Sequence, residues 1–191
     1  MLNTQIRILP SRETSPMTSD HERELKKWED MLGSRLSSDC RIFLLQFNAG
    51  SPHPNIFDEV TPDAVLRGYD TQAVCDRLYD LEQAMSSGKG NICGDAVPPG
   101  FVFFGQNPGG LAFLISLREV DFGAVFLWQG ATNRWGVDGN DEPRLFRQAD
   151  SFGAFLCRRY DTLEQSDHRH WATPDALNNA RIFEWEQGEC R

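Results

Sequence analysis

Three apolar runs in the middle of the chain constrain its fold more than any other feature. They cover residues 101–104, 111–117 and 123–128, and they are rich in β-branched and aromatic side chains. Asn-Pro-Gly-Gly at 107–110 supplies residues that tolerate positive φ, and a short polar bridge at 118–122 separates the second and third runs. Short apolar runs separated by such turns predict consecutive antiparallel strands, that is, a three-stranded meander.

A meander of this kind needs other elements to cover its apolar face, because a bare small sheet is only marginally stable. The preceding sequence offers helices. Leu25, Trp28 and Leu32 recur at helical spacing ahead of Gly33, which suits the end of a helix. A second helix is predicted over 37–47. The apolar residues of a third predicted helix are Val74, Leu78, Leu81 and Met85.

The sequence after the meander predicts a short strand at 144–149 and a helix that Ser151 caps. Apolar residues over 173–185 follow a Thr-Pro-Asp helix opening and predict a further helix. At the other end of the chain, residues 4–9 predict an edge strand. The expected fold class is α+β, with an antiparallel-rich sheet built on the central meander and covered by N-terminal and C-terminal helices.

Three segments are expected along the chain. Residues 1–17 form an N-terminal arm or edge strand, residues 18–162 form one α+β domain, and residues 163–191 form a partly helical C-terminal extension. A length of 191 residues fits a single domain with terminal additions.

The chain is acidic, with a formal net charge of −9 and a pI near 4.9. A general nucleic-acid binder needs a basic surface, so this charge argues against one. It suits plain solubility or a basic partner reached by electrostatic steering. No signal peptide is evident, and the apolar runs fall short of the ~20 residues of a membrane helix. We therefore expect a cytoplasmic protein that does not enter membranes.

Five cysteines are scattered along the chain and form no C-x-x-C pair. Zinc ribbons and thioredoxin-type motifs are therefore excluded, and reduced thiols are the simplest interpretation. We expect Cys40 and Cys157 to be inert core thiols, because each lies on the apolar side of a predicted helix.

Motifs for catalysis or cofactor binding are weak. The glycines of 88–94 follow no strand, residues 167–170 offer two histidines without further ligands, and residues 138–142 lack the calcium-loop spacing. Plain loops explain all three. G-x-S-x-G and H-E-x-x-H are both absent from the sequence. We predict no enzyme activity, cofactor or metal site, although an enzyme built from dispersed residues stays open.

Three of the tryptophans differ in their surroundings. Trp28 lies at helical spacing and Trp128 ends an apolar run, so both are expected in the core. Trp135 lies in a polar loop between glycines and charges. It is either a loop anchor or a contact residue for a partner, and the sequence leaves both alternatives open.

The order of these elements resembles a known family. Residues 32–52 read LGSRLSSDCRIFLLQFNAGSP, which is similar to the pattern L-P-x-D-(Y/L)-R-x-F-L-L-x-(Y/F)-N-G-G-x-P of the SUKH superfamily. Residues 105–117, 123–128 and 149–156 resemble the family's G-G-N-x-(I/L)-x-L hairpin, G-x-V-Y-x-W strand and I-A-x-S-F-x-x-F-L helix. The resemblance covers residues 19–160. The departures from these patterns are Ser37, Cys40, Ala49 and Leu111.

The resemblance implies an α+β domain that binds a toxin domain and blocks it without catalysis, since the superfamily includes bacterial immunity proteins and cell-wall-synthesis regulators. Our first hypothesis is a toxin-neutralising immunity protein, with a nuclease as one toxin class that suits the acidic charge. The alternative is a regulatory or scaffold module of the same fold that binds another protein or a peptide.

The family has no fixed binding motif, so the proposed partner-binding residues come from charge alone. We place them in two acidic loops, although ordinary solvated loops would look the same in sequence. They are Asp58, Glu59 and Asp63 in the first loop, and Trp135, Asp138, Asp141 and Glu142 in the second.

Overall fold

The structure is a computed structural model of the chain, and it describes residues 6–10, 20–58, 60, 72–87, 97–107, 111–128, 145–158 and 179–183. Its helices are α1 (His21–Leu32), α2 (Ser38–Gln46), α4 (Leu81–Ser87), α5 (Phe152–Cys157) and the 3-10 helix η1 (Glu119–Asp121). Its strands are β1 (Arg7–Leu9), β2 (Ser51–His53), β3 (Ile56–Asp58), β4 (Gln72–Val74), β5 (Arg77–Leu78), β6 (Phe101–Gln106), β7 (Ala112–Ser116), β8 (Val125–Trp128), β9 (Leu145–Ala149) and β10 (Arg181–Ile182).

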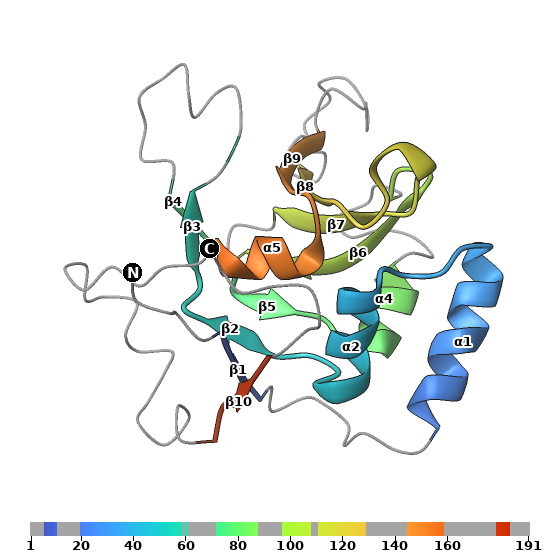
Figure 1. Ribbon diagram of the computed structural model, residues 1–191, viewed down its shortest axis with the longest axis horizontal. Coiled ribbons are helices and arrows are strands. Elements are labelled where there is room, and N and C mark those ends of the chain that lie inside the picture. Colours follow the sequence, from blue (N-terminus) through green and yellow to red (C-terminus); the bar gives the residue numbers. More distant parts are fainter. Residues whose placement is uncertain are drawn as a thin grey trace.

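Among the described residues there are three antiparallel sheets. The largest has five strands in the order β5-β6-β7-β8-β9, and its middle strands are the predicted meander (Figure 1). Leu114 of β7 pairs with Phe126 of β8. Gly123 has a φ of 80°, a left-handed conformation that glycine adopts at low cost, and it leads the chain from the turn into β8. The meander is confirmed, and the strand predicted at 144–149 is β9 at one edge of the sheet.

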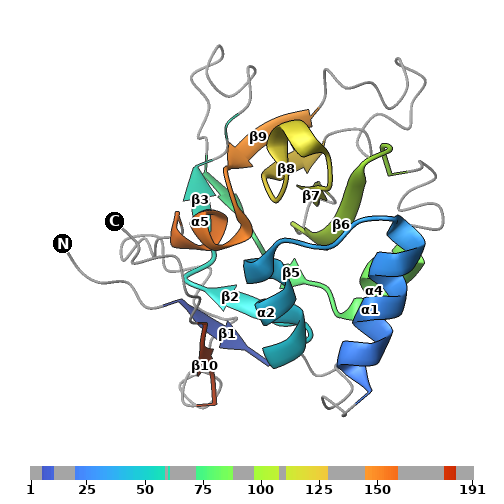
Figure 2. The ribbon, with the colours of Figure 1, turned by 45° about the vertical axis from the view of Figure 1, so that its right-hand side comes forward.

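Helices α2 and α5 lie across one face of this sheet (Figures 1 and 2). Phe113 of β7 is at the centre of the resulting core, with the ring centroids of Phe57, Phe104 and Phe155 at 5.3–6.1 Å. The opposite face carries a second apolar cluster. Its buried residues are Phe101, Phe103, Ala112, Leu114, Ala124, Phe126 and Trp128. The predicted α+β class is confirmed.

A buried carboxylate joins the two helices that cover the sheet. Asp39, in the first turn of α2, is 7% exposed. Its Oδ1 accepts a hydrogen bond from Cys40 N at 2.9 Å, and its Oδ2 accepts one from Gly153 N in the first turn of α5 at 2.7 Å. Ser151 Oγ accepts from Ala154 N at 3.1 Å, so the predicted cap of α5 is confirmed.

The helix predicted over 74–85 is correct only in its second half, which is α4. The first half forms β4 and β5 instead. Leu78 pairs with Gly105 of β6, so the backbone here completes the five-stranded sheet. Asp80 Oδ1 then accepts from Gln83 N at 2.6 Å and caps α4. Pairing with a distant strand has overridden the helical spacing of the apolar residues.

The strand predicted at 4–9 is confirmed as β1, but it is the central strand of a small sheet with the order β10-β1-β2 rather than an edge strand. The helix predicted over 173–185 is wrong at 181–182, which form β10; of this segment the structure describes only 179–183. Phe183 N donates to Ile6 O at 3.0 Å, so pairing with β1 holds this segment extended.

Cysteine and tryptophan predictions have mixed outcomes. Cys40 is buried and free, and burial, reinforced by the charges of Asp39 and Glu29, raises the pKa of its thiol. Cys157 corrects the expectation of an inert core thiol, because it is only partly buried and is disulfide-bonded. Trp28 and Trp128 are 6% and 0% exposed, which confirms that both belong to the core.

Candidate binding surfaces

Of the residues predicted to bind a partner, only Asp58 belongs to the described part of the chain. It is the last residue of β3 and is exposed, and its backbone oxygen accepts from Arg158 Nη2 at 3.2 Å. The first acidic loop therefore starts beside a cation. Six predicted residues lie outside the described residues: Glu59, Asp63, Trp135, Asp138, Asp141 and Glu142.

The described ends of both acidic loops meet β9. Gln148 of β9 is 3% exposed and holds Val60, with Oε1 accepting from Val60 N and Nε2 donating to Val60 O, both at 3.0 Å. The second loop leaves β8 at Trp128, and the chain re-enters the sheet at Leu145, the first residue of β9. Trp128 and Leu145 pair with each other across the two strands. The first loop thus leaves β3 and the second leaves β8, and the described ends of both meet the edge strand β9.

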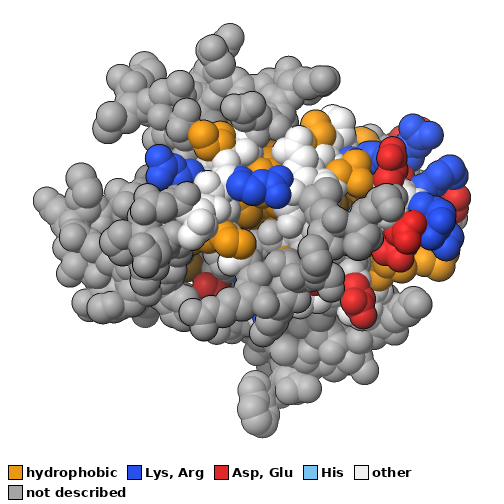
Figure 3. Space-filling view, turned by 90° about the horizontal axis from the view of Figure 1, so that it is seen from below, with side chains coloured by type: hydrophobic (Ala, Val, Ile, Leu, Met, Phe, Trp, Pro, Cys, Tyr) orange, Lys and Arg blue, Asp and Glu red, His pale blue; other side chains and the backbone are white. Residues whose placement is uncertain are grey.

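A depression of about 930 Å³, which the sequence analysis did not predict, lies on the polar side of α1 and the loop that joins α1 to α2. Lys, Arg, Asp and Glu side chains gather over α1 at the right-hand edge of Figure 3. We call this site the charged depression. Its lining residues are Glu22, Arg23, Lys26, Glu29, Asp30, Gly33, Ser34, Arg35 and Arg41.

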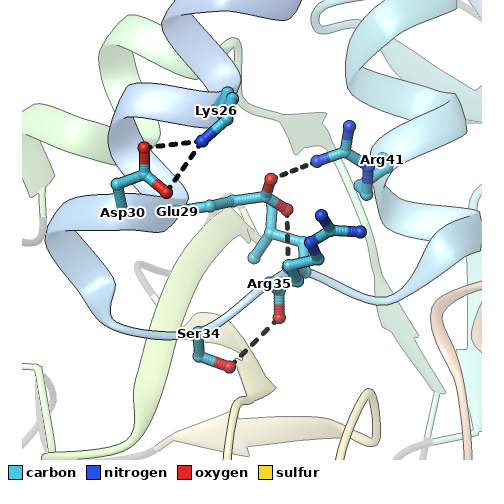
Figure 4. A network of polar contacts seen from close by, with 7 residues as sticks. Lys26, Glu29, Asp30, Ser34, Arg35 and Arg41 are labelled. Carbon is cyan, nitrogen blue, oxygen red and sulfur yellow. Dashed lines mark hydrogen bonds and ion pairs between the residues drawn. The ribbon is translucent and has the colours of Figure 1, made fainter.

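Glu29 is the fixed centre of the charged depression. Its carboxylate is 5% exposed, with Oε1 accepting from Leu36 N at 2.8 Å and Oε2 accepting from Arg41 Nη1 (Figure 4). The carboxylate thus ties the α1–α2 loop and the first turn of α2 to the last turn of α1. Since both oxygens are engaged and buried, Glu29 positions Arg41 and presents little negative charge to the surface.

The other cations of the depression differ in how firmly they are paired. Lys26 Nζ contacts both carboxylate oxygens of Asp30, at 2.8 and 3.1 Å, and Arg23 pairs with Asp20 at 3.0 Å. Arg35 is exposed, and its guanidinium has no hydrogen-bond or ion-pair partner within the described ranges. Exposed pairs such as these contribute little to stability and exchange readily with a ligand.

The turn between β7 and β8, residues 117–124, projects an apolar tip. Val120 is 84% exposed and Phe122 is 46% exposed. The turn also packs closely against the α1–α2 loop. The space between Gly123 and Ser37 is so small that a Cβ added to the glycine would lie 3.0 Å from Ser37 Cβ. The loop that carries Arg35 and the apolar turn are therefore neighbours on the surface.

Asp121 holds this turn together. Its Oδ1 accepts from Ser116 Oγ and from Arg118 Nε, the latter at 3.1 Å, and its Oδ2 pairs with Arg118 Nη2. The Arg118 guanidinium lies 4.7 Å from the centroid of the Phe101 ring. Hydrogen bonds from Arg118 keep the pKa of the Asp121 carboxyl below its usual value, although burial acts in the opposite direction.

Because this pKa is depressed in the folded protein, Asp121 stabilises the fold above the unfolded-state pKa of about 3.9 and ceases to do so as the pH falls through the folded value. Replacing Asp121 with asparagine should lower the free energy of unfolding by about 1–2 kcal/mol at pH 7, and by less below about pH 4. Urea denaturation across this pH range measures the difference. Asp150→Asn, at an exposed ion pair with Arg147, is the control and should change little.

The part of the chain that the structure describes contains neither a candidate metal site nor a candidate membrane-spanning helix. No group of three or more His, Cys, Asp or Glu residues is placed to hold a metal ion there. Nor does a helix in that part combine the length and apolar composition that crossing a membrane requires.

The fold and these surfaces define a class of protein: an α+β domain with an antiparallel core and solvent-facing charged and apolar patches. A sequence model of the SMI1 / KNR4 family (SUKH-1) matches residues 21–158, which run from the start of α1 to the residue after α5. The chain belongs to this family, and the SUKH resemblance is confirmed. No curated protein and no solved structure matches the chain. Membership is consistent with an immunity-type or regulatory module.

The structure gives physical roles to the residues that carried the resemblance. Asp39 bridges α2 to α5, and Arg41 pairs with the buried Glu29. Asn48 Oδ1 accepts from Leu81 N at 3.0 Å, at the first residue of α4. These contacts join the helices to one another and to neighbouring segments, so each of these motif residues has a structural role.

Proposed function

We propose that this protein is an immunity protein that binds and neutralises a cognate bacterial toxin domain, stoichiometrically and without catalysis. The observation that carries the proposal is the family match, which spans all helices in the described part of the chain and the whole five-stranded sheet. A toxin nuclease suits the net charge of −9, because nucleases carry basic clefts for phosphates.

The toxin-facing residues of this proposal are those of the two acidic loops, Asp58, Glu59, Asp63, Trp135, Asp138, Asp141 and Glu142. Two observations support them. Asp58 is exposed at the end of β3, and the described ends of both loops are anchored on β9. Loops that meet the same edge strand can present their charges to one partner, and complementary charge raises the association rate.

Co-expression with the toxin-type domain encoded directly upstream tests the function. Rescue of growth and a one-to-one complex on purification are the expected results. Continued killing without a complex would reject neutralisation of that toxin. It would favour the alternative, a regulatory or scaffold module that binds another protein or a peptide.

Charge reversal of the acidic loops tests the site. Changing Asp58, Glu59, Asp63, Asp138, Asp141 and Glu142 to lysine should weaken toxin affinity about tenfold or more, mainly through a slower association rate that matters less at high salt. Surface plasmon resonance at two salt concentrations measures both quantities. As a control, the exposed Glu24, Glu82 and Glu119 are changed to lysine, which should leave the affinity within about twofold. Unchanged affinity in the loop variant would remove these residues from the interface.

A further inference from the structure

We propose that the charged depression, together with the β7–β8 turn, is a second protein-binding surface that takes an acidic peptide segment ending in a large apolar side chain. This goes beyond the proposed neutralisation of a toxin. It uses other residues, and it calls for a partner of the opposite charge to the one that the acidic loops would bind.

Charge complementarity is the first argument. The lining of the depression has four cations against three carboxylates, a formal excess of one positive charge in a chain whose net charge is −9. Glu29 is buried and paired with Arg41, so the two charges offset each other, and Glu22 and Asp30 are the exposed acids of the lining. The lining therefore has a positive excess of one charge on a chain that is acidic as a whole.

The arrangement of the two arginines is the second argument. Their guanidinium groups lie on the same side of Glu29 (Figure 4). The bond to Glu29 holds Arg41 in place and leaves other N–H groups of Arg41, which is 25% exposed in its side chain, available to a ligand. The guanidinium N–H groups of Arg35 make no hydrogen bond or ion pair with any other described residue, so all of them can donate to a ligand. A fixed and a free guanidinium side by side suit a carboxylate, which binds arginine through two parallel hydrogen bonds.

The apolar turn is the third argument, and it favours a peptide over other anions. Val120 and Phe122 are exposed on a turn that touches the α1–α2 loop at Ser37. Exposed apolar side chains next to cations match a segment that carries both acids and an apolar anchor. A nucleic acid or polyphosphate would leave the apolar tip unused.

The test uses the full chain and a fluorescein-labelled synthetic peptide of twelve residues, six acidic, with phenylalanine and leucine at one end. Fluorescence anisotropy should show saturable binding that weakens with salt. Arg35→Glu should weaken it about tenfold or more, because one repulsive carboxylate replaces the free guanidinium. Val120→Ser with Phe122→Ser should weaken it severalfold. Lys27→Glu, an exposed residue of α1 outside the depression, is the matched control and should stay within about twofold.

Several outcomes would overturn the proposal: absence of saturable binding, an Arg35→Glu variant that binds like wild type, or equal losses in Arg35→Glu and Lys27→Glu. Equal binding of an acidic peptide without the apolar residues, or of inorganic tripolyphosphate, would reduce the surface to a non-specific cation patch. Toxin neutralisation should be unaffected by Arg35→Glu, so this proposal and the proposed function fail or succeed separately. Circular dichroism of each variant confirms that it folds.

Discussion

Replacing Asp39 with alanine is expected to lower the free energy of unfolding by about 3 kcal/mol, because one carboxylate serves two helices. Its Oδ1 accepts from Ser37 Oγ at 2.5 Å and from Cys40 N at 2.9 Å, and its Oδ2 accepts from Gly153 N at 2.7 Å. Without it, the N–H of Gly153 would be left buried and unpaired at the start of α5. The negative charge also faces the positive N-terminal ends of α2 and α5.

Urea denaturation of purified variants at pH 7 measures this effect. Asp39→Asn keeps one oxygen acceptor without the charge, so its cost should fall between wild type and the alanine variant. Asp30→Ala is the matched control, since Asp30 is exposed and pairs only with Lys26 among the described residues, and it should cost less than about 1 kcal/mol. If Asp39→Ala costs no more than this control, the carboxylate does not join the two helices energetically.

The parts of the fold that the sequence predicted correctly rest on local signals. The meander has turn residues at both reversals, and α5 has a serine cap directly before a run of apolar residues. Leu78 shows where local signals fail. It continues the helical spacing of Leu81 and Met85, but it pairs with Gly105, a residue 27 positions later. In the structure, Asp80 caps α4 through Gln83 N, and the helix begins only at the next residue.

The charged depression was missed for a related reason. Glu29 reads as an ordinary exposed residue of an amphipathic helix, and its burial depends on Arg41 and on the backbone of Leu36. Only the folded α1–α2 hairpin brings these groups together. In the sequence, Arg35 is a cation in the short loop between the first two predicted helices, and no acidic residue lies beside it. This pattern is the sequence signal that could have indicated a site for a negatively charged ligand. The acidic loops, in contrast, were visible as composition alone, and composition does not specify how they are arranged.

Phe183 is the site of the second large expected effect. Its side chain is 3% exposed, and its ring lies 6.1 Å from Phe43, 5.8 Å from Phe47 and 5.9 Å from Phe152, measured between centroids. Phe183→Ala is expected to lower the free energy of unfolding by about 3 kcal/mol or more, from lost burial and the cavity that remains. Thermal and urea unfolding of the full chain measure the loss.

The preceding residue, Ile182, which is the last of β10, provides the control. Ile182 is 42% exposed, so Ile182→Ala should cost less than about 0.5 kcal/mol, although its backbone pairs with β1 equally. The comparison also tests the predicted division of the chain at residue 162. The family match ends at residue 158, and Phe183 lies beyond it. If residues 163–191 form a separable extension, both variants will be as stable as wild type. If they complete the core, only the Phe183 variant will lose stability, and the domain will include its C-terminal strand.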